Sequence, residues 1–173
     1  MTTPRTVTAR RITAPAFAPF GRLLDTPGTM VRRDFAASVA NLRPAARANL
    51  ALVRAPWAAL GIEVRELERH PFSTQAFFPL DVADYLVVVA PDDGSGAPAS
   101  ERACAFVVPG TCGISYDIGV WHCGMQAIAG AGLFALLVFE DGSRDDTHVR
   151  PVAPFRVTWS ESHAGTAEAP SAD

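Results

Sequence analysis

Three ionisable side chains alternate along one short stretch of the sequence. Glu66, Glu68 and His70 stand two residues apart, and Pro71 follows directly. Successive side chains of an extended strand point to opposite faces, so these three share one face. Pro71 favours that conformation, because the residue before a proline is driven out of the helical region. Two carboxylates and an imidazole on one strand face are typical of a metal or proton-transfer site rather than of a plain core.

A second group with the same potential lies further along the chain. His122 follows Trp121 just after a tight glycine turn at 117–119. Taken with the two glutamates, His70 and His122 indicate a functional site rather than two ordinary interior histidines. Gln75 is either a ligand or a structural amide that satisfies backbone groups, and Trp121 either packs or contacts a substrate.

The composition restricts the functions open to this chain. The 173 residues are 49% hydrophobic and 19% charged, which predicts one globular domain over 1–160, with 161–173 as a flexible tail. All basic side chains are arginine, so a lysine Schiff base or lysine general base is excluded. The net charge of -3 and the scattered arginines predict no nucleic-acid partner.

The cysteines and the apolar segments indicate in which cellular compartment the protein works. The three cysteines, Cys104, Cys112 and Cys123, are odd in number and irregularly spaced. They predict neither a disulfide framework nor a paired-cysteine zinc site. The N-terminus lacks an apolar signal region, and no stretch is long enough to cross a bilayer. We therefore expect a cytoplasmic protein without a membrane partner.

Short strands separated by Gly and Pro must position these residues. A capped turn of helix is expected at 13–21. The expected strands are 6–12, 49–54, 62–70, 74–78, 85–90, 104–108, 113–116, 121–128 and 133–140. No helix is long enough for a parallel crossover, so the pattern predicts an antiparallel sandwich or barrel.

The spacing of the candidate residues resembles the cupin superfamily. The first cupin motif places two metal ligands two residues apart on a strand and a third four or five residues on, and a later motif supplies a His after a Gly turn. The residues that match are Glu68, His70, Gln75 and His122. The resemblance implies an all-β, double-stranded β-helix barrel with short peripheral helices, and a divalent metal ion on these four side chains.

Longer runs resemble one family within that superfamily, the ureidoglycolate lyases. The similar segments are 66–71, 74–79, 87–90 and 119–122, and the likeness extends over residues 10 to 150. It implies a homodimeric enzyme that splits ureidoglycolate into glyoxylate and urea. That reaction needs a base for the hydroxyl proton and an acid for the departing nitrogen. Glu66, Glu68, His70 and His122 are the candidates for these two roles.

Substrate binding is the less defined part of the resemblance. The family carries an arginine close to Arg32 and Arg33, so either could bind the substrate carboxylate. Cys123 stands where the family often has a second histidine. Two alternatives therefore stay open: a non-catalytic cupin that binds a small carboxylate, and a cupin enzyme acting on another hydroxy- or keto-acid.

Overall fold

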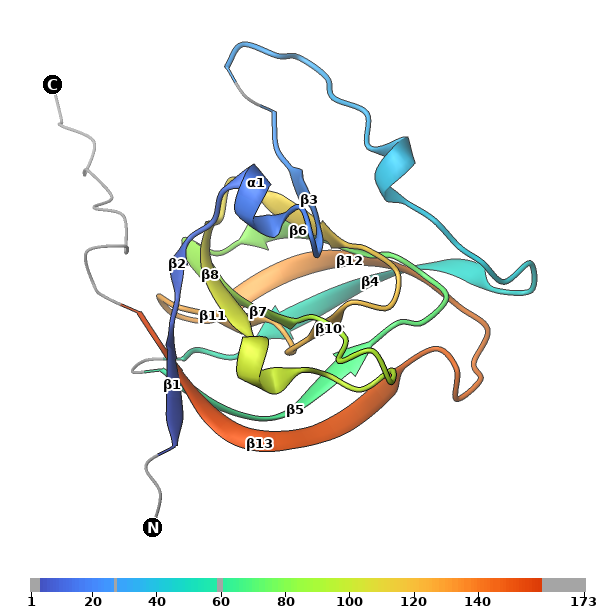
Figure 1. The fold of residues 1–173 in the computed structure, drawn as a ribbon. Coiled ribbons are helices and arrows are strands. Elements are labelled where there is room, and N and C mark those ends of the chain that lie inside the picture. Colours follow the sequence, from blue (N-terminus) through green and yellow to red (C-terminus); the bar gives the residue numbers. More distant parts are fainter. Residues whose placement is uncertain (1–3, 27, 59–60, 160–173) are drawn as a thin grey trace, which may run out of the picture.

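Two β-sheets wrap around a common core in the computed structural model, which describes residues 4–26, 28–58 and 61–159 (Figure 1). The first sheet has the order β1 (Arg5–Thr8), β13 (His148–Thr158), β5 (Ile62–Arg69), β10 (Trp121–His122), β7 (Asp84–Ala90), β8 (Cys104–Pro109) and β2 (Arg10–Arg11), with β11 (Gln126–Ala127) also paired to β7. The second sheet has the order β3 (Gly21–Leu24), β9 (Gly113–Tyr116), β6 (Gln75–Asp81), β12 (Gly132–Glu140) and β4 (Arg47–Ala55).

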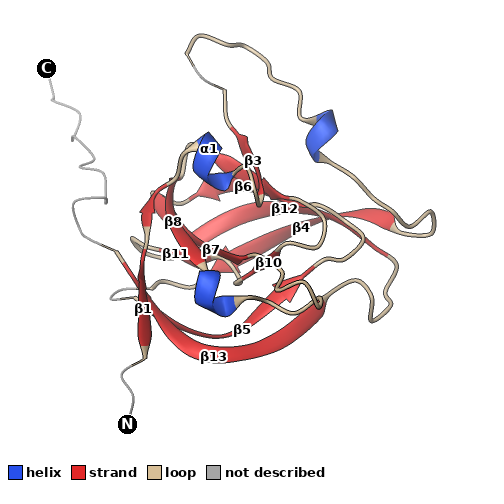
Figure 2. Ribbon diagram, viewed as in Figure 1, coloured by secondary structure: helices blue, strands red, loops and turns tan. Residues whose placement is uncertain are grey.

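Helices contribute little to this fold and lie at its periphery (Figure 2). In the part of the chain that the structure describes they are α1 (Ala14–Phe17) and two short 3₁₀ turns, η1 (Ala36–Ser38) and η2 (Ser100–Arg102). The predicted all-β, cupin-like barrel with short peripheral helices is therefore confirmed. No helix in the described part of the chain is long and apolar enough to cross a membrane. The predicted tail, 161–173, lies outside the described residues.

The core explains why the run 85–90 is continuously apolar. Tyr85, Val87 and Val89 face the cluster between the two sheets, whereas Leu86 and Val88 face a second cluster on the opposite side of the first sheet. Strand β7 is thus buried on both faces, and a strand in that position reads as an unbroken hydrophobic run.

The helical turn α1 begins at the expected cap. The Thr13 hydroxyl accepts a hydrogen bond from the backbone N–H of Ala16, and Phe17 at the end of the turn is fully buried. The Phe17 ring meets Phe106 of the first sheet edge-on, with centroids 6.0 Å apart, and lies 6.1 Å from the ring of Tyr116 in the second sheet. This short turn therefore joins the two sheets through their aromatic core.

Two strand predictions need correction. The expected strand 6–12 is two short strands, β1 and β2, which pair in parallel with different partners, β13 and β8. The expected strand 121–128 is interrupted between β10 and β11, because β10 lies between β5 and β7 whereas β11 pairs with β7 and bridges to Trp57.

The longest strand was not predicted at all. Strand β13 contains Pro151 and Pro154, and prolines normally count against a strand. Here the pairing register of β13 with β5 shifts between Pro151 and Phe155, so a bulge accommodates the prolines within one continuous pairing.

Candidate functional site

Strand pairing brings the first two candidate residues together. His122 on β10 lies directly opposite Glu68 on the neighbouring antiparallel strand β5. Directly opposed residues of an antiparallel pair have side chains on the same face and only a few ångströms apart. His70 follows β5 and belongs to the same alternating series as Glu68, as the sequence predicted.

The three side chains form a compact group. The donor atoms offered by Glu68, His70 and His122 all lie within 4.8 Å of one another. The Oε1 of Glu68 is 3.5 Å from the Nε2 of His122, and the two imidazole rings are stacked with centroids 5.7 Å apart. Both histidines are buried and Glu68 is partly buried. These residues therefore form a possible metal-binding group.

Backbone carbonyls determine which nitrogen of each histidine faces the group. The Nδ1 of His70 is 2.8 Å from the carbonyl oxygen of Asp146, and the Nδ1 of His122 is 2.9 Å from that of Val120. A carbonyl only accepts, so each Nδ1 carries the proton and donates it. Each Nε2 is left with a lone pair, and both Nε2 atoms are buried without a hydrogen-bond partner among the described residues. Metal-binding histidines are commonly oriented in this way.

The protonation states of Glu68 and His70 also suit metal binding. A hydrogen bond from His122, made when that imidazole carries a proton on Nε2, lowers the pKa of the Glu68 carboxyl, against the opposing effect of burial. Burial lowers the pKa of His70, and the nearby His122 acts in the same direction. At neutral pH Glu68 is an anion and His70 is neutral, which are the forms that bind metals. An anionic oxygen and two imidazole lone pairs directed at one space fit a divalent cation.

A pocket of about 260 Å³ opens beside this group. It is lined by Glu66, Leu67, Glu68, His122, Cys123, Gly124, Gln126 and Val149. Glu66 thus shares the pocket with Glu68 without belonging to the possible metal-binding group. Burial raises the pKa of the Cys123 thiol to about 11, and the charges of Glu68 and Glu66 act in the same direction. The thiol is therefore protonated at neutral pH and is a weak nucleophile.

Gln75 reaches the site from the opposite sheet. It is buried on β6, directly opposite Tyr116 on β9. The Tyr116 ring in turn stacks on His122, with centroids 4.2 Å apart and an interplanar angle of 17°. Neither the Oε1 of Gln75 nor the hydroxyl of Tyr116 has a hydrogen-bond partner. A metal-binding role for Gln75 stays a prediction.

The other predicted substrate contacts are placed differently. Trp121 is buried in the second hydrophobic cluster, and the guanidinium of Arg69 lies 4.6 Å from its ring centroid. Arg32 pairs with Asp34 at 2.8 Å, and Arg33 pairs with Asp25 at 2.5 Å. The segment between β3 and β4 that carries both arginines extends away from the barrel (Figure 1). Substrate binding by Trp121, Arg32 or Arg33 also stays a prediction.

Sequence reasoning missed the residues that hold His70 in place. The Arg43 guanidinium pairs with the carboxylates of Asp146 and Asp141 and donates to the Ser143 hydroxyl. The Asp146 carboxylate also accepts hydrogen bonds from the backbone N–H groups of Asp141 and Gly142. The carbonyl of the same Asp146 accepts from His70. Arg43 and Asp146 are far apart in the sequence, so no local pattern marks this connection.

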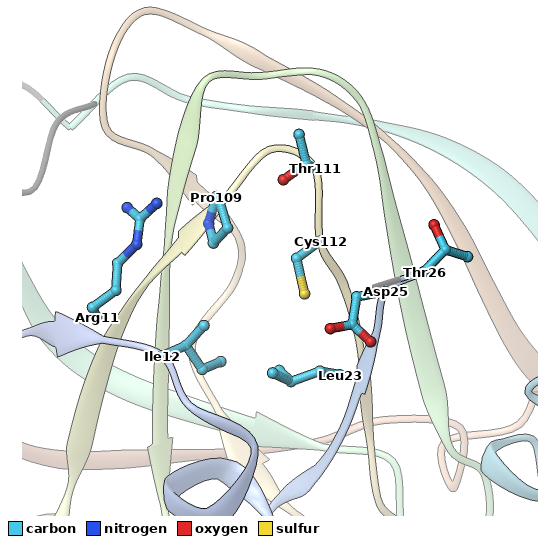
Figure 3. A pocket seen from close by; sticks show the side chains of 8 residues that line it. All are labelled: Arg11, Ile12, Leu23, Asp25, Thr26, Pro109, Thr111 and Cys112. Carbon is cyan, nitrogen blue, oxygen red and sulfur yellow. The ribbon is translucent and has the colours of Figure 1, made fainter. Parts of the chain in front are cut away.

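A larger pocket lies elsewhere in the fold (Figure 3). It has a volume of about 420 Å³ and is lined by Arg11, Ile12, Leu23, Asp25, Thr26, Pro109, Thr111 and Cys112. Its charged groups are already paired, Arg11 with Asp84 and Asp25 with Arg33. Burial raises the pKa of Cys112 to about 11, so this thiol is also protonated. The pocket therefore offers less reactive chemistry than the group around Glu68.

The fold and the site together define a cupin-type barrel with a possible metal-binding group of one carboxylate and two histidines. Comparison with known proteins gives the family. The model of the ureidoglycolate lyase family matches residues 4–157, nearly the whole chain. The chain therefore belongs to the ureidoglycolate lyase family, whose members are lyases.

Individual relatives support the same assignment. The chain is 38% identical to a ureidoglycolate lyase of Pseudomonas fluorescens (strain Pf0-1) over 127 residues, which cover 68% of this chain and 75% of the relative. It is 34% identical to a ureidoglycolate lyase of Brucella ovis over 150 residues, which cover 82% of this chain and 86% of the relative. The range matched by the family model, residues 4–157, includes the strands that carry the site.

The contacts of Arg43 lead to a prediction about the 141–147 turn. In the variant Arg43→Met the Asp146 carboxylate loses its ionic partner, and the turn that holds His70 should open more often. We expect the backbone amides of Asp141 and Gly142 to exchange with solvent at least about tenfold faster, measured by hydrogen exchange. Arg65→Met removes an exposed guanidinium and serves as the control. Unchanged exchange in Arg43→Met would contradict this role.

Proposed function

We propose that this protein cleaves ureidoglycolate into glyoxylate and urea. The observation that carries the proposal is the buried group of Glu68, His70 and His122 in a chain that belongs to the ureidoglycolate lyase family. The chemistry of the substrate supports it further. Ureidoglycolate carries a carboxylate, a hydroxyl and a ureido nitrogen on one carbon, and the pocket beside the group supplies both a cation-binding end and a free carboxylate.

The reaction needs only one proton to move. A base removes the hydroxyl proton, the carbonyl of glyoxylate forms, and the carbon–nitrogen bond breaks with its electrons going to the urea nitrogen. That nitrogen must then be protonated. Glu66 supports both steps, because it lies in the pocket and is outside the possible metal-binding group. The proton it accepts from the hydroxyl can return to the departing nitrogen, so no covalent nucleophile is needed.

We also propose that Glu68, His70 and His122 hold a divalent metal ion. The support is the orientation of the two histidines, whose unpartnered Nε2 atoms face the Glu68 carboxylate. Such an ion would polarise the hydroxyl and the carboxylate of the substrate. The protein supplies the rest: it orients the imidazoles through backbone carbonyls and excludes water from the buried histidines.

A turnover assay tests the activity. We expect the purified protein to release urea and glyoxylate from ureidoglycolate, and His122→Ala to lower turnover at least about a hundredfold, the scale on which acid–base or ligand groups act. His148→Ala is the matched control, because His148 is partly exposed on β13 beside Asp145. No turnover by the wild type, with or without added divalent metal, would refute the proposal, even if glyoxylate stabilised the fold.

Metal binding is tested separately by calorimetry. After treatment with a chelator, the wild type should bind about one equivalent of Co²⁺, and His70→Ala should weaken binding at least about tenfold because it deletes one donor nitrogen. His148→Ala should bind Co²⁺ like the wild type. Equal Co²⁺ affinity in wild type and His70→Ala would remove His70 from the ligand set.

We propose that two copies of the chain associate through the outer face of the second sheet. Strand β4 is the last strand of that sheet. Phe78, Ala135 and Leu52 form one cross-strand row on β6, β12 and β4, and Leu50 stands beside Leu137 in the next row. The side chains of Leu50 and Leu52 are 75% and 70% exposed.

A second copy suits this surface better than other partners. When this face packs against the same face of a second copy about a two-fold axis, one contact covers both apolar faces and shields both β4 edges. A long apolar edge strand left uncovered would be an aggregation hazard. We therefore propose a homodimer built around β4.

The dimer proposal is tested by introducing a charge on this face. We expect a dimeric wild type and a monomeric Leu52→Arg variant in analytical ultracentrifugation, because a buried unpaired charge opposes association. Val31→Arg is the control, since Val31 is fully exposed on the segment between β3 and β4. A monomeric wild type at micromolar concentration would rule the proposal out.

We further propose a cytoplasmic location. It is supported by Cys104, Cys112 and Cys123, all of which are free thiols. Free cysteines persist in reducing compartments, whereas exported proteins commonly carry disulfides.

A further inference from the structure

Two side chains next to the possible metal-binding group, Gln75 and Tyr116, each carry a polar atom that the fold does not satisfy. Gln75 is 5% exposed and Tyr116 is 1% exposed. The Oε1 of Gln75 and the hydroxyl oxygen of Tyr116 are both buried without a hydrogen-bond partner. Buried polar atoms in folded proteins nearly always have partners, so two neighbouring exceptions indicate that something else binds them.

The positions of Gln75 and Tyr116 direct both toward the same space. They are directly opposite each other on the adjacent strands β6 and β9, so their side chains share the inner face of the second sheet. The Tyr116 ring lies flat against His122, which belongs to the first sheet. The pair therefore lies on the inner face of the second sheet, where Tyr116 touches one member of the group of Glu68, His70 and His122.

The chemistry of this pair differs from that of the group. Glu68 and the histidines offer an anion and lone pairs, which attract a cation and, through it, a carboxylate. Gln75 and Tyr116 are neutral: the amide oxygen accepts a hydrogen bond, and the hydroxyl can donate one. A neutral pair of this kind complements a group that has N–H donors and a carbonyl acceptor close together.

We propose that Gln75 and Tyr116 form a subsite for the neutral ureido group of the substrate. The inference rests on the proposed function for the identity of the substrate. The Gln75 oxygen accepts a hydrogen bond from a ureido N–H, and the Tyr116 hydroxyl donates to the ureido carbonyl. Tyr116 thereby selects ureido acids over simple hydroxy- and keto-acids, because the smaller acids leave both buried groups unpaired.

Binding of two stable acids tests the subsite without turnover. Oxalurate carries a ureido group and cannot eliminate urea in the same way, whereas oxalate has only carboxylates. By calorimetry on the full chain, the wild type should bind oxalurate more tightly than oxalate. Tyr116→Phe and Gln75→Leu should each weaken oxalurate binding about tenfold and change oxalate binding less than about twofold, as expected for one lost hydrogen bond.

The chain offers a matched control in its only other tyrosine. Tyr85 is also fully buried, but its hydroxyl donates to the carbonyl of Cys112 at 2.7 Å. Tyr85→Phe breaks a satisfied hydrogen bond, so it should lower the melting temperature and leave the oxalurate preference intact. Tyr116→Phe removes an unpartnered hydroxyl, so it should keep the melting temperature and lose the preference. The same Tyr→Phe change should therefore lower the melting temperature at position 85 and abolish the oxalurate preference at position 116.

The outcomes separate the subsite from the activity. The subsite is overturned if the wild type binds oxalurate no better than oxalate, if both Tyr116→Phe and Gln75→Leu keep the preference, or if they weaken both acids equally. A wild type that releases no urea but shows a Tyr116-dependent preference would refute the lyase activity and support the subsite. An active wild type without that preference would refute the subsite alone.

Discussion

The pairing of β10 between β5 and β7 is the constraint on which the site depends. This strand is only two residues long, yet His122 lies opposite Glu68 on one side and opposite Val89 on the other. A shift of one residue would turn His122 out of the group and place Trp121 there instead. The burial of Trp121 in the second cluster opposes that shift, because the large ring would have to leave the core. The packing of Trp121 on one face of β10 thus keeps His122 in the site on the other face.

The two histidines of the site also need hydrogen bonds from elsewhere in the fold to fix the orientation of their rings. Each histidine is held by a carbonyl from a different segment: Asp146 for His70 and Val120 for His122. These bonds leave the Nε2 atoms without a proton and hold the rings 5.7 Å apart. No donor among the described residues satisfies these atoms, so two buried acceptors remain whose complement is a cation or a substrate proton. The turn anchored by Arg43 is what makes the Asp146 carbonyl a fixed acceptor.

Much of this arrangement was predictable because it is local in sequence. The alternation of Glu66, Glu68 and His70 with a following proline places three side chains on one face without any knowledge of the fold. The residues that hold these side chains in place could not be predicted from the sequence pattern. Asp146 lies 103 residues from Arg43 and 76 from His70, and the bond to His70 uses a main-chain atom that every residue possesses. Strand β13 was hard to predict for a different reason, since its prolines are tolerated only because the pairing register shifts between Pro151 and Phe155.

In the arrangement that we propose, the two sheets divide the recognition of the substrate between them. The first sheet supplies the ionisable members of the group: Glu68 on β5, His122 on β10, and His70 directly after β5. The second sheet supplies neutral Gln75 and Tyr116, and the stacking of Tyr116 on His122 connects the two sides. A ligand with a carboxylate at one end and a ureido group at the other matches that division. A symmetric dicarboxylate does not, because its second charge would have to be desolvated against neutral side chains that have no cation to offer. The asymmetry of the barrel interior is therefore itself an argument for the asymmetric substrate.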